Sequence, residues 1–279
     1  MAIRKLDTLP NSRKNVALKL DPTRVDPRKL KLGKQPVRHD PRTLLFASYL
    51  TAALPTPPAS YDAGTAVTDW GMMDNDQIGD CTCAAAGHLI MEWTARAKSK
   101  VFTPSDKQIV AAYSAITGYN PVSGANDNGA NEIDVLNYWR QSGIAGHKIS
   151  AYVALEPANH THIMDSVYIF GGCYIGLGLP LSAQAQTQNH QPWSVPPQGT
   201  TGDGKPGSWG GHAVPVIAYD SRTLTVITWG ARQTMTWGFW KAYCEEAYAI
   251  LSPDFLTGKK ATPEGFNLHQ LQEDLADLK

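Results

Sequence analysis

The chain has 279 residues, of which 42% are hydrophobic and 18% charged, so it is long enough to bury a substantial core. Its four cysteines are too few for a disulfide framework, and the sequence predicts a reducing, cytoplasmic location. A signal peptide and a membrane span are not expected, because charges begin at Arg4 and the first apolar run, residues 44–54, is short and late.

Charge is divided unevenly along the chain, although the formal net charge is zero. The first 45 residues contain twelve Lys and Arg against four Asp, and the rest of the chain carries the balancing negative charge. A basic arm of this kind favours contact with an acidic protein surface or with phosphate groups, and a solvated leader is the alternative interpretation. Recognition of nucleic-acid bases is not expected, because the segment lacks interleaved aromatic residues.

Three regions follow one another in the sequence. Repeated prolines, which fix φ and extend the preceding residue, predict an extended basic arm over residues 1–60, with a short helix allowed only within 42–54. Residues 61–255 are predicted to form the folded body. The tail, residues 256–279, is predicted to hold a short amphipathic helix that docks on this body rather than on a partner; its apolar stripe is Leu268, Leu271, Leu275 and Leu278.

The body begins with helical patterns and ends with strand patterns. Helices are predicted over 81–97, 105–118 and 131–143, and strands over 167–179, 212–220 and 223–230. A long polar loop, forming a functional rim or a mobile lid, is expected over 182–211. Helices first and strands later predict an α+β fold.

Two cysteines stand at the predicted start of the first helix. A thiolate is stabilised at a helix N-terminus by the helix dipole and by free N–H groups, and also by a neighbouring imidazolium. Cys81 follows Asp80, the predicted N-cap, whereas Cys83 lies about 200° further around the helix. Only one of the two can therefore face a given base.

Two motifs carry a resemblance to a known family. The stretches "IGDCT" (78–82) and "GSWGGHAVPVIAYD" (207–220), followed by a Trp-Gly pair, resemble the papain-like cysteine peptidases, above all their divergent bacterial and phage relatives. The resemblance covers residues 61–255. It implies a two-lobed fold, with an N-terminal helical lobe and a C-terminal antiparallel β lobe, and a thiol hydrolase that acts on a peptide or protein substrate without a cofactor or metal.

The resemblance also selects a nucleophile. The family has a small residue two positions before the reactive cysteine, and Gly79 holds that position for Cys81. Counting back six residues from Cys81 reaches Asn75, which with the Cys81 N–H would hold the oxyanion. Counting back from Cys83 reaches Gln77, the reserve interpretation. Cys83 is expected to pack inward as a small hydrophobic residue.

The family pattern assigns the base to His212, with a histidine merely satisfied inside a sheet as the alternative. His88, seven residues after Cys81, is a weaker candidate for which a structural role is expected. Cys81 and Cys83 with His88 do not form a zinc-ligand spacing, so no metal site is predicted.

The third position departs from the family. If Trp229-Gly230 is the family's Trp-Gly pair, Ile227 stands where an asparagine would orient the histidine, and an isoleucine cannot accept a hydrogen bond. Asp220, Thr225 or Thr228 could replace it, although none occupies the matching position.

Two hypotheses follow from these motifs. The first is a thiol hydrolase that uses Cys81, His212 and Asn75. The alternative is a catalytically impaired papain-like fold that serves as a structural or binding component of a larger assembly, such as a phage particle, anchored by the basic arm.

Overall fold

The computed structural model describes residues 26–41, 43–49, 55–255 and 273. The predicted amphipathic helix of the tail, with its four leucines, lies outside the described residues, as does the first part of the arm. None of the helices in the described ranges has both the length and the apolar content needed to cross a membrane.

The three predicted helices are confirmed as α1 (Cys81–Lys98), α2 (Asp106–Thr117) and α3 (Glu132–Gln141). A capping box formed by Ser105 and Gln108 starts α2, and the Asn131 side chain accepts the Ile133 N–H at the start of α3. Asp80 does occupy the N-cap position of α1, but within the described chain its side chain makes no capping hydrogen bond.

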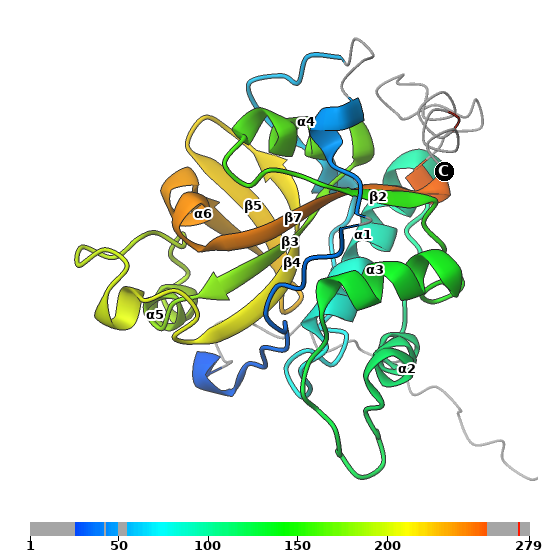
Figure 1. Cartoon of the computed structure of the whole chain (residues 1–279), viewed down its shortest axis with the longest axis horizontal. Helices are drawn as coiled ribbons and strands as arrows, with labels where there is room; N and C mark the ends of the chain where they lie inside the picture. Colours follow the sequence, from blue (N-terminus) through cyan, green and yellow to red (C-terminus); the bar gives the residue numbers. More distant parts are fainter. Residues whose placement is uncertain (1–25, 42, 50–54, 256–272, 274–279) are drawn as a thin grey trace, which may run out of the picture.

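The strands form one antiparallel sheet in the order β2-β7-β3-β4-β5-β6, with β1 paired to β4. The bounds are β1 Tyr61–Asp62, β2 Ala151–Ala154, β3 Cys173–Leu179, β4 Gly210–Tyr219, β5 Thr223–Thr228, β6 Ala231–Thr236 and β7 Cys244–Leu251. The sheet lies on one side of the molecule and α2 and α3 on the other, with α1 between them (Figure 1). The predicted α+β, two-lobed architecture is therefore confirmed.

The region predicted as one strand over 167–179 is divided in two. Residues 167–170 belong to helix α4 (His160–Phe170), and β3 begins only at Cys173. Gly171, at φ +75°, ends α4 in the left-handed conformation that glycine adopts without strain. The apolar run "VYIF" suits a buried helix as well as a buried strand, and its short length hides the difference.

The segment 182–211 is more ordered than the predicted polar loop. It contains helix α5 (Ser182–Gln188) and a short 3-10 helix, Gly202–Gly204. Trp193 is fully buried and pairs with β6, since its N–H donates to the Thr234 carbonyl (2.9 Å) and its carbonyl accepts the Thr236 N–H (2.9 Å). One large aromatic side chain thus anchors the segment to the sheet.

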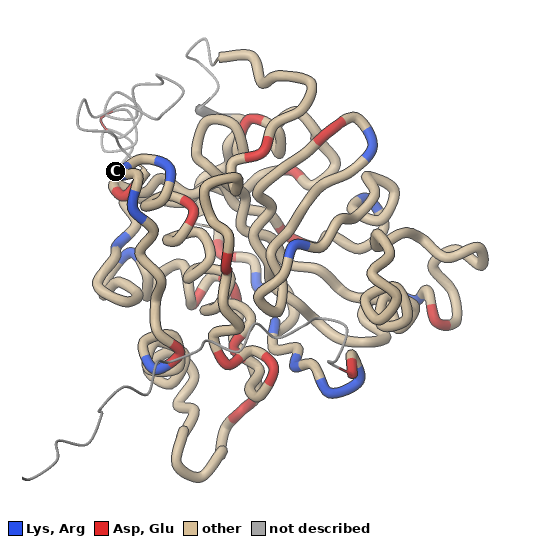
Figure 2. Tube along the Cα trace, turned by 180° about the vertical axis from the view of Figure 1, so that it is seen from behind, with Lys and Arg blue, Asp and Glu red and all other residues tan. Residues whose placement is uncertain are grey.

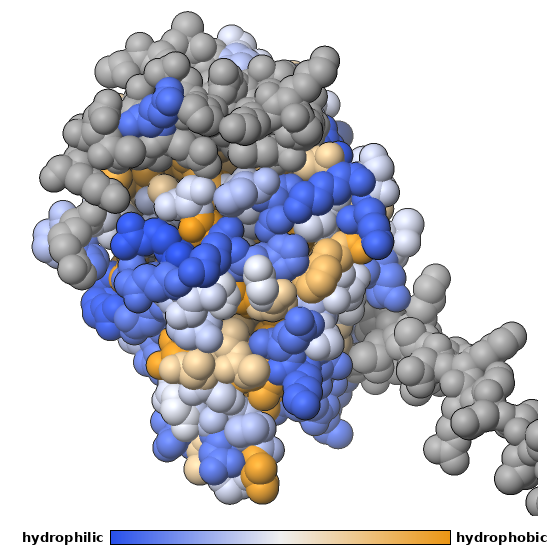
Figure 3. Space-filling view, turned by 90° about the vertical axis from the view of Figure 1, so that its right-hand side faces the viewer, coloured by the Kyte–Doolittle hydropathy of each residue, from blue (hydrophilic) through white to orange (hydrophobic). Residues whose placement is uncertain are grey.

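The core lies where the two sides meet. Residues Cys81 to Ala95 of α1 are buried on every face, which is unusual for a helix of a soluble protein and results from its position between the sheet and the other helices. Outside the core, charges of both signs are interspersed along the chain (Figure 2), and hydrophilic and hydrophobic residues are mixed on the helical side (Figure 3).

The described part of the arm is not free, and the extended form predicted for the arm as a whole stays a prediction. It contains 3-10 helices at Pro27–Lys29 and Phe46–Tyr49, the second of them inside the range where a short helix was allowed. Lys34 forms an isolated parallel bridge with Ala130, just before α3. In Figure 1 this dark blue segment passes between the sheet and α3. The division at residues 60 and 255 stays a prediction.

Candidate active site

Cys81 is the first residue of α1 and is 1% exposed. The backbone N–H of Ala213 donates to its Sγ at 3.4 Å, and the backbone N–H of Gly33, from the arm, also lowers the pKa of this thiol. Burial raises the pKa of Cys81 to about 12, against the lowering effect of these two N–H groups, while the charges of Asp80 and Glu132 raise it further. In this conformation the thiol is protonated.

His212 lies near the start of β4 and is buried. Its Nε2 is 2.7 Å from the Thr228 hydroxyl, and the Trp229 ring stacks on the imidazole with 4.5 Å between centroids. Its Nδ1 is buried and has no hydrogen-bond partner among the described residues. Burial lowers the pKa of His212 to about 3, so the imidazole is neutral.

The junction of α1 and β4 brings these two positions together. Ala213, whose N–H reaches the Cys81 sulfur, directly follows His212 in the chain. Sequence reasoning named both residues, from segments 131 positions apart. An N–H donor to sulfur favours the thiolate over the thiol, although burial outweighs this effect in the conformation described.

Of the three candidates for orienting the histidine, only Thr228 has a hydrogen-bond contact with the imidazole among the described residues. Ile227, at the family's asparagine position, is buried on β5 opposite Arg232. Asp220 accepts the N–H groups of Arg222 and Thr223 in the β4–β5 turn, and no contact of the described residues joins it or Thr225 to His212. Sequence reasoning included Thr228 among three candidates and could not choose, because the choice depends on the register of β5 against β4.

A tight turn places the indole over the imidazole. Trp229 and Gly230 both have positive φ, +46° and +71°, and form the two-residue connection between β5 and β6. Turns of this type match the twist of an antiparallel pair, and glycine at the second position is common in them. The less usual tryptophan at the first position shields one face of His212.

The two oxyanion candidates lie in different surroundings. Asn75 is buried, and its Nδ2 donates to the Ile78 carbonyl at 3.3 Å in the turn before α1. Gln77 is exposed and its side chain donates to Asp76 instead. These positions favour Asn75 over Gln77, although the oxyanion role of either stays a prediction.

Cys83 and His88 occupy structural positions, as expected. Cys83 is fully buried in the core. His88 is buried, with Nε2 3.1 Å from the Gly71 carbonyl and its ring edge-on to Trp70. Burial lowers the pKa of His88 to about 4, which keeps this core imidazole neutral.

Sequence reasoning missed that the arm crosses this site. The Lys34 N–H donates to the Gly211 carbonyl (3.0 Å), the Ala130 N–H donates to the Gly33 carbonyl (2.8 Å), and the Gln35 N–H donates to the Ala130 carbonyl (2.9 Å). The arm thus connects β4 to the segment before α3 in the manner of an added strand.

Gly33 sits at the narrowest point of this crossing. A Cβ added to it would lie 1.7 Å from the Gly79 carbonyl oxygen, so only glycine fits. In the sequence, only Gly33 itself signals this close approach. The residues around it form no distinctive pattern.

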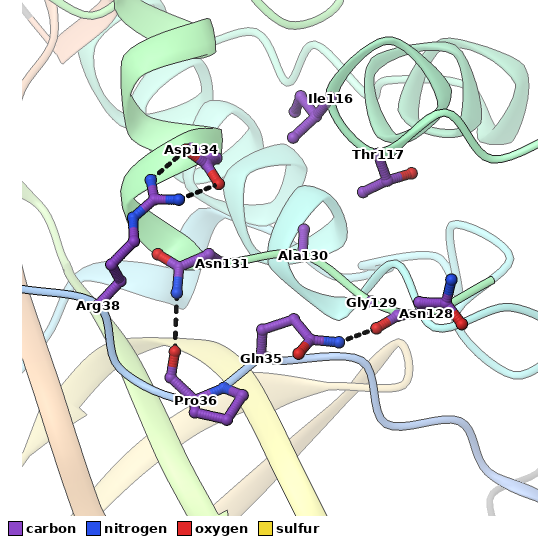
Figure 4. Close-up of a pocket in the computed structure, with 10 residues that line it drawn as sticks. All are labelled: Gln35, Pro36, Arg38, Ile116, Thr117, Asn128, Gly129, Ala130, Asn131 and Asp134. Carbon is purple, nitrogen blue, oxygen red and sulfur yellow. Dashed lines mark hydrogen bonds and ion pairs between the residues drawn. The ribbon is translucent and has the colours of Figure 1, made fainter. Parts of the chain in front are cut away.

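Side chains hold the arm beyond this point. A cavity of about 460 Å³ lies beside it, lined by the arm and by the segments before and after Ala130 (Figure 4). Arg38 pairs with Asp134 of α3, the Asn131 Nδ2 donates to the Pro36 carbonyl (2.7 Å), and Gln35 donates to the Asn128 carbonyl. The arm is therefore fitted to the groove on both sides.

Comparison with solved structures identifies the architecture. Xylellain, a cysteine protease from Xylella fastidiosa, superposes with a TM-score of 0.60 at 17% identity, over 80% of this chain and 96% of that one. The chain has the papain-like fold. The procathepsin B S9 of Trypanosoma congolense (TM-score 0.51, 12% identity, 81% and 88% of the two chains) and procathepsin L 3 of Tenebrio molitor (0.51, 13%, 78% and 76%) also match.

The sequence comparisons found no relative of this papain-like chain. No protein-family model matches it, and no curated protein is similar to it in sequence. The likeness at these identities is one of fold, so the residues that act must be argued from this chain's own geometry.

Proposed function

We propose that this papain-like chain is a thiol hydrolase that cleaves a peptide or amide bond of a peptide or protein substrate. The observation that carries the proposal is the Ala213 N–H on the Cys81 sulfur, next to an imidazole that Thr228 and Trp229 hold in place.

The proposed hydrolysis requires a nucleophile, a base and two oxyanion donors. The Cys81 sulfur attacks the carbonyl carbon, its proton passes to His212, and His212 returns the proton to the leaving amine as the carbon–nitrogen bond breaks. Water then hydrolyses the thioester. Nδ1 of His212 is the nitrogen free to carry the proton, because Nε2 contacts Thr228. The Cys81 N–H and the Asn75 side chain are the proposed oxyanion donors.

The enzyme so proposed is latent in the conformation described. The arm is hydrogen-bonded between Gly211, the residue before His212, and Ala130, and so occupies the space that a substrate would need. The arm must therefore leave before any substrate reaches the sulfur. The four free cysteines fit the cytoplasmic location that we also propose.

The alternative, an assembly component anchored by the arm, stays a prediction. Contacts of the arm within residues 26–41 are with its own body, and they favour an intramolecular role for this part. We therefore prefer the enzyme.

Turnover by the full-length Gly33→Ala variant tests the proposal, because the added Cβ prevents the arm from seating at Gly79. This variant is expected to hydrolyse a mixed fluorogenic peptide pool, and adding Cys81→Ala should abolish the activity. Adding Cys83→Ala, a matched change two residues away, should retain it. Hydrolysis that survives Cys81→Ala would refute the assignment.

A further inference from the structure

The side chain of Lys34 is buried in an acidic pocket. It is 0% exposed, and its Nζ lies 2.8 Å from Glu245 Oε2 and 3.0 Å from Glu246 Oε1. The Gln35 carbonyl accepts a further hydrogen bond from it at 3.2 Å. A lysine is almost never fully buried unless it is paired. The pocket must therefore provide the hydrogen bonds and the charge stabilisation that water gives to an exposed ammonium group.

Glu132, the first residue of α3, adds a third carboxyl group. It is fully buried, and neither carboxyl oxygen has a hydrogen-bond partner among the described residues. Burial opposes the charge of Lys34, but the negative charges of Glu132 and Glu246 outweigh this and raise the pKa of Lys34. Conversely, burial raises the pKa of Glu132 well above its usual range, and the charge of Lys34 lowers it. A cation in the pocket therefore stabilises the ionised carboxylates.

The walls are shaped for a long, thin side chain. Gly176 of β3 faces the stem of Lys34, and a Cβ there would lie 2.0 Å from the lysine Cε and 2.8 Å from Glu132 Oε1. The Tyr248 hydroxyl donates to Glu246 Oε2 at 2.8 Å and so orients that carboxylate toward the ammonium. Three elements, α3, β3 and β7, thus build one narrow pocket with an acidic end.

The residues that form the pocket come from the folded body and not from the arm. Glu132, Glu246 and Gly176 all come from the body, and the side chain that fills the pocket, Lys34, comes from the arm. When the arm leaves, two buried carboxyl groups lose their cation, at a free-energy cost that a new basic side chain in the same place would remove. The Lys34 N–H also donates to the carbonyl of Gly211, which directly precedes His212 in β4.

We propose that this pocket selects substrates that carry a lysine, or a similar basic side chain, one or two residues from the bond cleaved, and that Lys34 occupies it as a stand-in. This inference rests on the proposed function, since it names the substrate class of the same site. Glu132 and Glu246 are the specificity-determining residues, and Glu245, 39% exposed at the rim, contributes less because water screens its charge.

Peptide binding tests the pocket without requiring turnover. Full-length Gly33→Ala protein is titrated, by fluorescence anisotropy, with a labelled peptide copying residues 30–36 and with the same peptide carrying norleucine in place of the lysine that corresponds to Lys34, while the lysine that corresponds to Lys31 is kept. The lysine peptide should bind at least about tenfold more tightly, since it pairs with buried charges. Full-length Lys34→Met protein is a second host in case Gly33→Ala folds poorly.

Substitutions in the pocket test which residues cause the preference for the lysine peptide. Glu132→Gln and Glu246→Gln, which keep the shape of the pocket, should each reduce the ratio of the two affinities severalfold. Asp134→Asn is the matched control, because it removes an arm contact on α3 outside the pocket, and it should leave the ratio unchanged. Equal binding of the two peptides, no binding of either, or a ratio that neither glutamine variant changes would overturn the pocket.

Hydrolysis is measured separately on the same peptides. A lysine preference in binding without cleavage of any peptide would refute the proposed function and leave the pocket standing. Cleavage of the peptides without any preference for lysine in binding would support the proposed function and refute the pocket.

Discussion

His212 depends on two neighbours for its orientation. The Thr228 hydroxyl contacts Nε2, and the Trp229 indole covers one face of the ring. A hydroxyl is both donor and acceptor, so it can accept from a protonated Nε2 and leave Nδ1 as the basic nitrogen. In the proposed mechanism, the Thr228 hydroxyl replaces the carboxamide that the family resemblance places at the position of Ile227.

Replacing Thr228 with valine tests this role. Valine keeps the shape and removes the hydroxyl, so in the Gly33→Ala background kcat should fall about tenfold, the loss expected for one hydrogen bond. The affinity for the peptide copying residues 30–36 should be unchanged, because Thr228 does not contact the arm in the described structure. The matched control is Thr225→Val on the same strand. Equal rates for the two valine variants would show that the hydroxyl does not position the ring.

At the scale of elements, we expect the arm to control the access of water to Cys81. Burial is the largest cause that raises the pKa of Cys81 to about 12, and the Gly33 N–H of the arm acts in the opposite direction. At pH 8 such a thiol is ionised in only about one molecule in 10,000. Removing the arm readmits water, which must lower the pKa, because the charged form is then solvated.

Alkylation by iodoacetamide as a function of pH measures this effect. In the native chain the rate at Cys81 should be very low at pH 8 and should rise only toward pH 12, whereas in Gly33→Ala the rise should move to lower pH. We expect the rate at pH 8 to increase about 100-fold or more, which corresponds to a fall of two pKa units.

Two controls accompany the alkylation. Gly238→Ala, where an added Cβ has only the Thr236 hydroxyl at 3.7 Å, should behave as the native chain. Trypsin should cleave after Lys34 in Gly33→Ala and not in the native chain, which shows that the arm has moved. A displaced arm with an unchanged pH profile would contradict the role given to burial.

At the scale of the whole molecule, Trp193 joins the 182–211 segment to the β lobe. Its indole N–H donates to the Thr187 hydroxyl (2.9 Å), and its ring lies edge-on to Trp229, the residue that stacks on His212. The aromatic cluster that anchors this segment therefore also contacts the residue that covers His212.

Trp193→Ala should lower the free energy of unfolding by about 3–5 kcal/mol, the usual cost of emptying a buried aromatic site. Urea denaturation followed by circular dichroism measures the change. Gln198→Ala, at an exposed position of the same segment, should alter it by less than about 0.5 kcal/mol. A loss below 1 kcal/mol for Trp193→Ala would mean that the segment is not anchored through this residue.

Local patterns in the sequence determined much of the architecture. The boundaries of α1, α2 and α3 follow from helix formers between polar caps and glycine or serine stops, and the strands β4 and β5 follow from β-branched runs ended by turn residues. Cys81 and His212 stand out because the residues around each motif are contiguous in the chain. These signals depend on neighbours within a few positions, which a sequence displays directly.

Tertiary structure alone decided the rest. The choice of Thr228 over Thr225 and Asp220 depends on how β5 is registered against β4, and the pocket for Lys34 is assembled from Glu132, Gly176 and Glu246, which are scattered over 115 positions of the chain. The position of the arm depends on backbone hydrogen bonds, which any residue type except proline can donate and which therefore leave almost no mark on the sequence. Contacts between distant segments are determined by packing of the whole chain, and no local pattern encodes them.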